Sequence, residues 1–294
     1  MKNTAPNIVT DSDKDYLTEY DSVADAEKYP LVQKWLKTEP LPFFKQLRKE
    51  RPILVTPECT LVSLFTDVRD VLQMPKVFTV DLYKPKMGVT EDSPGYLMAH
   101  DDDALHYREK SLMQGFLNRD DIPQVRQLVQ ESARTILDKA NGSIEIVNDY
   151  CRWVPAVLVQ NYFGLDGVSK KKLLRWSFWN QFNSFHNQPF DLNSQQKFNH
   201  IVDEHNKASK ELVTYIAILM ARKLFVVRVL GMITGPLRFI ARLFKIKCKD
   251  DMVKRMIRSS MAMEVDFSLL RIAVNAGGLL IGCLLYTSPS PRDA

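Results

Sequence analysis

Apolar residues recur every three or four positions through most of the chain, the spacing of helices that bury one face. This spacing predicts helices over residues 102–117, 121–140, 146–163, 169–187, 194–223, 250–263 and 267–282. Before them, Pro40 opens a segment in which Phe43, Phe44 and Leu47 share a helical face. The pattern therefore predicts a mainly α, multi-helix protein.

Other parts of the chain lack this spacing. The runs PILVTP and CTLVSLFT, joined by Pro57-Glu58, predict a small β-sheet near the N-terminus. Residues 1–37 are polar and are interpreted as an N-terminal extension. The stretch 74–98 is punctuated by prolines and glycines and predicts a long irregular connection, which in a compact domain is usually functional or disordered.

The composition is that of an ordinary globular protein, with 45% apolar and 26% charged residues. Cys59, Cys151, Cys248 and Cys283 lie far apart, so neither a disulfide framework nor a zinc knuckle is expected. The N-terminus has no apolar leader, and no uncharged apolar run reaches the ~18 residues that span a bilayer. We expect a cytoplasmic protein. No glycine-rich phosphate loop or G-x-S-x-G motif occurs, so nucleotide binding and serine hydrolysis have no support.

Positive charge is concentrated in one segment. Residues 212–249 contain eight basic residues and no acidic residue, while the whole chain carries +5. The segment 222–249 has two interpretations: peripheral contact with an anionic membrane surface or acidic partner, or a connector that covers the core with Lys and Arg stems. We favour the second. Nucleic-acid binding is not expected, because one short patch on a nearly neutral protein attracts phosphate weakly.

Three polar residues line one side of the predicted helix 102–117. Asp102, His106 and Lys110 are spaced four apart, on a stripe separate from the apolar one. The His and Lys of this stripe, at the edge of a core, could hold an anionic group. The same spacing also suits a solvated ladder of side-chain pairs, and spacing alone favours the ladder.

The sequence around this stripe, LMAHDDDALHYREKSLMQGFLNRDDI, resembles the C-helix region of the cytochrome P-450 family, where an aspartate precedes a His-x-x-x-Arg pair. The resemblance implies that His106 and Lys110 take the places of the two residues that hold the haem propionates. Lysine departs from the pattern, because an ammonium lacks the planar pair of donors that fits a carboxylate.

Three further stretches resemble the family in the same order. PFFKQLRKERPILVTPECTLVSLFTDVRDVLQMPKVFT is similar to its first helix, opening strand pair and following short helix. IEIVNDYCRWVPAVLVQNYFGLDG is similar to a segment with Val-Pro and Phe-Gly-Leu, and DDMVKRMIRSSMAMEVDFSLLRIAVNAGGLLIG to the helices that enter the central helix. Residues 38–282 are thus identified as a partial P-450 domain, which implies an incomplete P-450-like fold.

The central helix of the family crosses one face of the haem, and by resemblance Ala276, Gly277 and Gly278 lie there. Helical glycines suit that place because they allow another surface to approach closely. The family's run leads to Ala/Gly-Gly-x-Asp/Glu-Thr, but after Gly282 this chain reads CLLYTSPSPRDA. We therefore expect no catalytic acid–alcohol pair, and residues 283–294 are interpreted as a non-native tail. The family's Phe-x-x-Gly-x-x-x-Cys-x-Gly loop is missing too, so no axial metal ligand is expected.

The resemblance implies an oxidoreductase: a monooxygenase that uses haem b to insert one oxygen atom from O2 into a small apolar organic substrate. A ferredoxin or flavoprotein redox partner would supply electrons. This chain is then expected to be an inactive fragment. The alternative is a non-catalytic protein, either a binder of apolar ligands or a membrane-surface adaptor using residues 222–249.

Three weaker signals remain in the sequence. His200, Glu204 and His205 resemble a zinc-peptidase motif whose spacing is one residue too long, which favours a solvated surface. An aromatic band over residues 176–185 marks, by resemblance, the helix above the substrate pocket, with ordinary core packing as an equal alternative. By the same resemblance, residues 87–98 form the loop that closes over the substrate.

Overall fold

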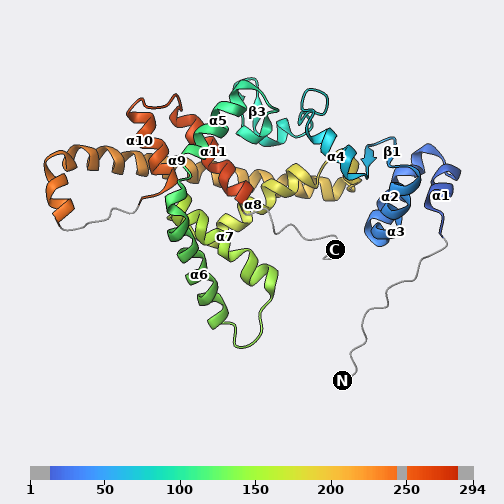
Figure 1. The fold of residues 1–294 in the computed structure, drawn as a ribbon, viewed down its shortest axis with the longest axis horizontal. Helices are drawn as coiled ribbons and strands as arrows, with labels where there is room; N and C mark the ends of the chain where they lie inside the picture. The colour runs from blue at the N-terminus through green and yellow to red at the C-terminus, as the bar shows by residue number, and fades with distance from the viewer. Residues whose placement is uncertain (1–13, 244–249, 284–294) are drawn as a thin grey trace. The chain divides into compact units, whose positions relative to one another are not determined.

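The computed structural model describes residues 14–243 and 250–283, with the backbone alone for 230–243 and 283. The chain divides into two compact units, residues 14–78 with 189–192, and residues 79–188 with 193–283. Helices dominate both units (Figure 1), so the predicted mainly α fold with small β pieces is confirmed.

The first unit contains helices α1 (Tyr16–Ser22), α2 (Asp25–Thr38), α3 (Pro40–Glu50) and α4 (Phe65–Leu72), and strands β1 (Ile53–Val55) and β2 (Thr60–Val62). The strands are antiparallel, with Leu54 opposite Leu61. They form the sheet expected near the N-terminus.

Helices α1 and α2 lie where the sequence showed only a polar extension. Aromatic residues anchor them, because Tyr16, Trp35 and Phe43 are fully buried with ring centroids 5.0–5.7 Å apart. Aromatic anchors bury a large area with few residues, so a short polar segment can still contribute to a core. Asp15 caps α1 by accepting a hydrogen bond from the backbone N–H of Thr18.

The second unit is built from helices. They are α5 (Ala104–Gly115), α6 (Ile122–Asp138), α7 (Trp153–Leu158), α8 (Lys170–Phe185), α9 (Gln195–Leu243), α10 (Met252–Met261) and α11 (Leu269–Cys283). Wider π-helical turns, Ile146–Cys151 and Val159–Phe163, flank α7. Six helical segments were predicted within a few residues, but α9 continues twenty residues past the predicted end at 223.

Helix α11 is the centre of this unit. It lies alongside α8, α9 and α10 (Figure 1). Ile272, Ala276 and Leu280, spaced four apart, are fully buried on one face. Burying such a stripe fixes the rotation of α11 about its own axis, and therefore decides which residues its other faces present.

The connection 79–99 is irregular, as predicted. It contains a 3₁₀ turn (Lys84–Met87), a two-stranded hairpin of β3 (Val89–Thr90) and β4 (Ser93–Pro94), and a second 3₁₀ turn (Leu97–Ala99). We call residues 79–99 the strap. Within the described ranges, no helix is both long and apolar enough to span a bilayer.

Candidate functional site

His106 lies in the first turn of α5. Asp103 caps this helix and accepts a hydrogen bond from the backbone N–H of His106 at 2.8 Å. The imidazole is 6% exposed, and its Nδ1 is 3.1 Å from the carbonyl oxygen of Leu97. Since a carbonyl only accepts, Nδ1 carries a hydrogen. Nε2 is 4.0 Å from the nearest oxygen of Asp102, and no described residue forms a hydrogen bond with it, so it can take another partner.

Lys110, the second predicted propionate ligand, is exposed one turn further along α5. Its neighbour Arg108 is also on the surface and pairs with Asp266 at 3.1 Å. The structure therefore separates the two predicted residues by burial: His106 is enclosed, and Lys110 lies in solvent.

A buried charge cluster, not found from the sequence, lies beside His106. Glu109 is 0% exposed, and both of its oxygens accept hydrogen bonds from Arg271 on α11 at 2.5 Å. Asn275, one turn further along α11, donates to the same carboxylate at 2.8 Å. The sequence held two signals for this cluster. Glu109 interrupts an otherwise apolar stripe, and Arg271 and Asn275 lie four residues apart on an apolar helix.

The same cluster holds the strap. Arg271 donates to the carbonyl of Gly95 at 2.7 Å, and Asn275 accepts from the N–H of Leu97 at 3.3 Å. The carbonyl of Leu97 then accepts from His106. A continuous set of hydrogen bonds therefore connects α11, the strap and the imidazole.

The three predicted residues of α11 point in different directions, because successive helical residues are rotated by about 100°. Ala276 is buried in the core. A side chain added at Gly277 would meet nothing within 4 Å, whereas one at Gly278 would come within 2.0 Å of the Tyr96 ring. Gly277 is thus the open position, and at Gly278 the strap approaches too closely for any side chain.

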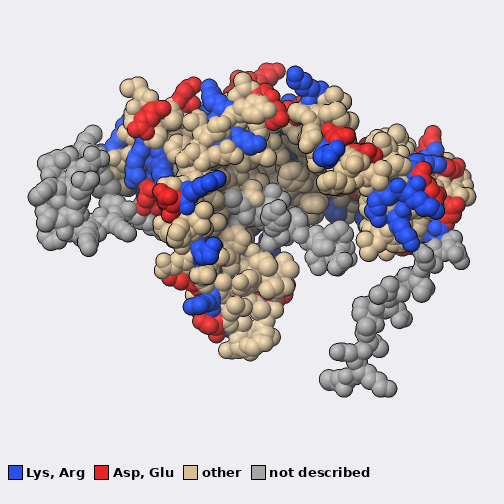
Figure 2. Space-filling model, viewed as in Figure 1, with Lys and Arg blue, Asp and Glu red and all other residues tan. Residues whose placement is uncertain are grey.

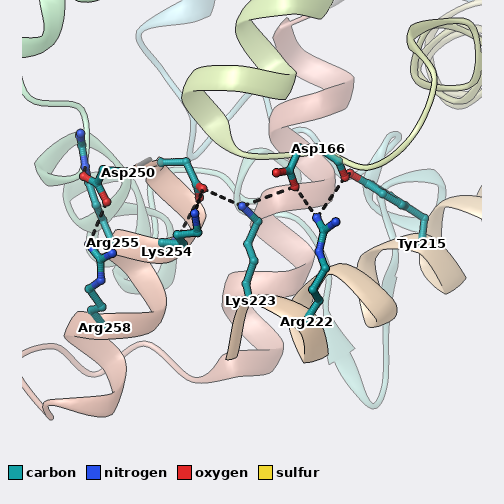
Figure 3. A network of polar contacts seen from close by, with 9 residues as sticks. Asp166, Tyr215, Arg222, Lys223, Asp250, Lys254, Arg255 and Arg258 are labelled. Carbon is teal, nitrogen blue, oxygen red and sulfur yellow. Dashed lines mark hydrogen bonds and ion pairs between the residues drawn. The ribbon is translucent and has the colours of Figure 1, made fainter. Parts of the chain in front are cut away.

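A second ion network joins α9 and α10 to the turn after Phe163 (Figure 3). Lys223 pairs with Asp251 at 2.7 Å, and both side chains are at least 97% buried. Arg222 pairs with Asp166, and Arg255 and Arg258 both pair with Asp250. Figure 2 shows basic and acidic side chains adjoining near α10.

This network bears on the basic segment 222–249. Arg222 and Lys223 are held by carboxylates, so they do not contribute free positive charge to a membrane-facing surface. Arg238 and Arg242 lie on α9 where the backbone alone is described, and Lys245, Lys247 and Lys249 lie outside the described residues.

The network also predicts a dependence of stability on pH. The hydrogen bond from Arg255 lowers the pKa of Asp121 below 3.8, with help from Tyr162. A carboxyl whose pKa is lowered in the folded state stabilises it fully above pH 3.8, and loses this effect as the pH falls through the folded value. Arg255→Met should therefore cost about 1–2 kcal/mol at pH 7 and much less at pH 3. Urea unfolding at the two pH values measures this.

Arg69→Met is the matched control for that measurement, because Arg69 pairs with Asp70 on the exposed surface. Exposed pairs contribute little, so this variant should unfold like the wild type at both pH values. An Arg255→Met penalty that is equally large at pH 3 would contradict the assignment to Asp121.

The remaining candidate features carry little chemistry. Among the described residues, no group of three His, Cys, Asp or Glu side chains is arranged to hold a metal. Glu204 pairs with Lys207 at 2.7 Å, while burial lowers the pKa of His205. Open hollows of about 760 and 440 Å³ adjoin α7, but none of the predicted cofactor residues lines them.

Comparison with known proteins supports the fold. No protein-family model matches the chain, and no curated protein matches it. Among solved structures, it is similar to the crystal structure of full-length CYP116B46 from Tepidiphilus thermophilus, with a TM-score of 0.54 and 14% sequence identity. The match covers 84% of this chain and 31% of that one. The likeness shows a P450-like fold over part of a much longer P450 chain.

Proposed function

We propose that this chain is part of a haem-dependent monooxygenase of the cytochrome P-450 type. The observation that carries the proposal is the enclosed His106, with Nε2 free, tied through the strap to a glycine-bearing helix in a P450-like fold. O2, an organic substrate with an apolar body and a ferredoxin or flavoprotein partner belong to the same proposal, and a cytoplasmic location stays a prediction.

The residues present fit one end of the cofactor. An imidazolium at His106 would donate from Nε2 to a propionate oxygen, while the Leu97 carbonyl fixes the ring through Nδ1. Lys110 can reach a propionate only from the solvent side. Cys59 and Cys151 are the free thiols in the described part. Cys59 packs against the aromatic core of its own unit and Cys151 is exposed, so neither is assigned to the iron.

The haem, when bound, would supply the activation of oxygen. The contribution of this chain is to position the group and keep water away. His106 holds the propionate end, Gly277 leaves open space on α11, and Tyr96 on the strap covers Gly278. No described residue is assigned to proton delivery, and the proposal derives no step at the iron.

Hemin titration of the purified chain tests the proposal. The wild type should bind hemin saturably, as a Soret band shift, and His106→Ala should weaken binding about tenfold, because one charge-assisted hydrogen bond is lost. His186→Ala removes an exposed imidazole at the end of α8 and should bind hemin like the wild type.

Circular dichroism confirms that each variant keeps its helices before affinities are compared. Equal affinity of the wild type and His106→Ala would remove His106 from the site. Failure of the wild type to bind hemin saturably would reject the cofactor proposal itself for this chain.

A further inference from the structure

The buried side of the C-terminal half of α8 is polar, which is unusual for a helix inside a domain. After the buried Leu173 and Trp176, the enclosed positions of α8 and two positions just beyond its end are amides and hydroxyls: Ser177, Asn180, Gln181, Asn183, Ser184, Asn187 and Gln188. Burying an amide or hydroxyl costs free energy unless it is hydrogen-bonded. Each of these groups therefore needs a partner.

Many of these groups find partners in neighbouring segments. Asn180 donates to the carbonyl of Trp176 at 2.8 Å and accepts from Ser209 on α9 at 2.8 Å. Ser184 donates to the carbonyl of Lys86 on the strap at 3.4 Å. The polar side of α8 thus faces other elements of the unit rather than solvent.

Ser177 and Gln181, four residues apart on one stripe, are different. The Gln181 amide nitrogen donates to Ser177 Oγ at 3.0 Å and to the carbonyl of Ile281 on α11. Because that carbonyl can only accept, the amide orientation is fixed, with Oε1 pointing elsewhere. Among the described residues, neither Oε1 nor the Ser177 hydroxyl hydrogen has a partner.

The Gln181 acceptor is not sealed inside the protein. In the described part, the side-chain nitrogens and oxygens that are fully enclosed without a partner are Trp35 Nε1 and Arg152 Nε. Gln181 Oε1 is not one of them, so this unpaired acceptor is accessible in part, although its residue is only 4% exposed. An accessible acceptor and an unpaired hydroxyl hydrogen therefore lie one helical turn apart on α8.

This position lies near the candidate cofactor helix. Gln181 is bonded to Ile281, and Ile281 is one helical turn from Gly277 and Gly278. Phe178 and Phe182, which follow Ser177 and Gln181 in the sequence, stack at 5.3 Å on the same helix. Helix α8 thus carries a neutral hydrogen-bonding pair and an aromatic pair on neighbouring stripes.

We propose that Ser177 and Gln181 form a polar subsite that binds a neutral amide or hydroxyl group on an otherwise apolar substrate. The inference rests on the proposed function, in which α11 borders the reaction site, and it narrows the substrate class. A wholly apolar molecule would leave both groups unpaired, whereas an amide would accept from Ser177 and donate to Gln181.

Matched probes test the subsite: 4-phenylbutanamide, and butylbenzene, which lacks the amide. Binding is followed by tryptophan fluorescence, since Trp176 and Trp179 lie on α8. The wild type should bind the amide about tenfold more tightly than butylbenzene. Gln181→Met and Ser177→Ala should each reduce that preference several-fold.

Gln188→Met is the control, because it makes the same exchange at a buried glutamine just beyond the end of α8. It should keep the preference for the amide. Equal binding of the two probes by the wild type, no binding of either at millimolar concentration, or an unchanged preference in Gln181→Met would each overturn the subsite.

Hemin titration separates this inference from the proposed function. Hemin binding that depends on His106, without an amide preference, would reject the subsite and keep the monooxygenase. An amide preference that depends on Gln181, without hemin binding, would keep the subsite and reject the monooxygenase in favour of a non-catalytic ligand-binding protein.

Discussion

Replacing Glu109 with leucine is expected to lower the free energy of unfolding by about 3–5 kcal/mol, since removing one partner of a buried ion pair leaves the other charge uncompensated. Glu109 is fully buried, and it forms two hydrogen bonds of 2.5 Å with Arg271. The side chain of Arg271 is 11% exposed, and among the described residues it would keep the carbonyl of Gly95 as its one acceptor. Chemical denaturation at pH 7 measures the loss.

Two further variants show whether the penalty comes from the uncompensated charge. The double variant Glu109→Leu/Arg271→Leu should recover much of the stability, because an apolar pair can replace a buried ion pair at little cost. Arg108→Leu breaks the exposed pair with Asp266 and should cost less than about 1 kcal/mol. A double variant as unstable as Glu109→Leu would show that packing, and not the unpaired charge, causes the loss.

Glu109→Leu should also change the candidate cofactor site. Arg271 and Asn275 hold Gly95 and Leu97 of the strap, and Leu97 fixes the His106 ring. Loosening this set of bonds lets the imidazole turn away from the position proposed for a propionate. We expect weaker hemin binding in this variant under conditions where it remains folded.

The sequence predicted helices where burial follows the 3.6-residue period. The stripe of Ile272, Ala276 and Leu280 is such a case, and α11 was expected within a few residues of its bounds. Helices α1 and α2 were not predicted from the sequence. A few buried aromatic residues hold them in place, and neither helix has a continuous apolar stripe. Helix α9 was predicted to end at Lys223, but it continues to Leu243, and the buried carboxylate of Asp251 pairs with Lys223.

The candidate site was partly accessible from the sequence. His106 was selected through its resemblance to a known motif, since spacing alone favoured a solvated ladder, and the structure encloses its side chain. Glu109 was missed because a charged residue is normally assigned to the surface. Its partner Arg271 is 162 positions away, so periodicity within one helix cannot pair them. Long-range charge pairing of this kind becomes visible only once the helices are placed.

The second large effect is expected at Asp251. Its carboxylate is 2% exposed, pairs with Lys223, and caps α10 by accepting from the N–H of Lys254 at 2.9 Å. Gly164, in the left-handed region at φ +91°, lies against this carboxylate without room for a Cβ. Asp251→Ala should cost about 4 kcal/mol, of which the lost cap supplies about 1 kcal/mol.

Asparagine at the same position separates the two contributions. Asp251→Asn keeps a good cap but removes the charge, so most of the penalty should remain. Lys223 would then keep Asp166, 3.7 Å away, as its nearest carboxylate, with Lys254 nearby. A penalty in Asp251→Asn below about 1 kcal/mol would show that capping, and not charge pairing, is the main role of Asp251.

The penalty of Asp251→Asn should depend on pH with a definite sign. Burial lowers the pKa of Lys223 below 10.5 even with Asp251 present, because desolvation outweighs the two neighbouring carboxylates. Without Asp251 that pKa falls further. A lysine whose pKa is lowered in the folded state destabilises it while charged, and this cost recedes as the pH rises from the folded value toward 10.5. The stability difference between the wild type and Asp251→Asn should therefore shrink between pH 7 and pH 10. A difference that stays constant across this range would mean that Lys223 is not the charge left unpaired.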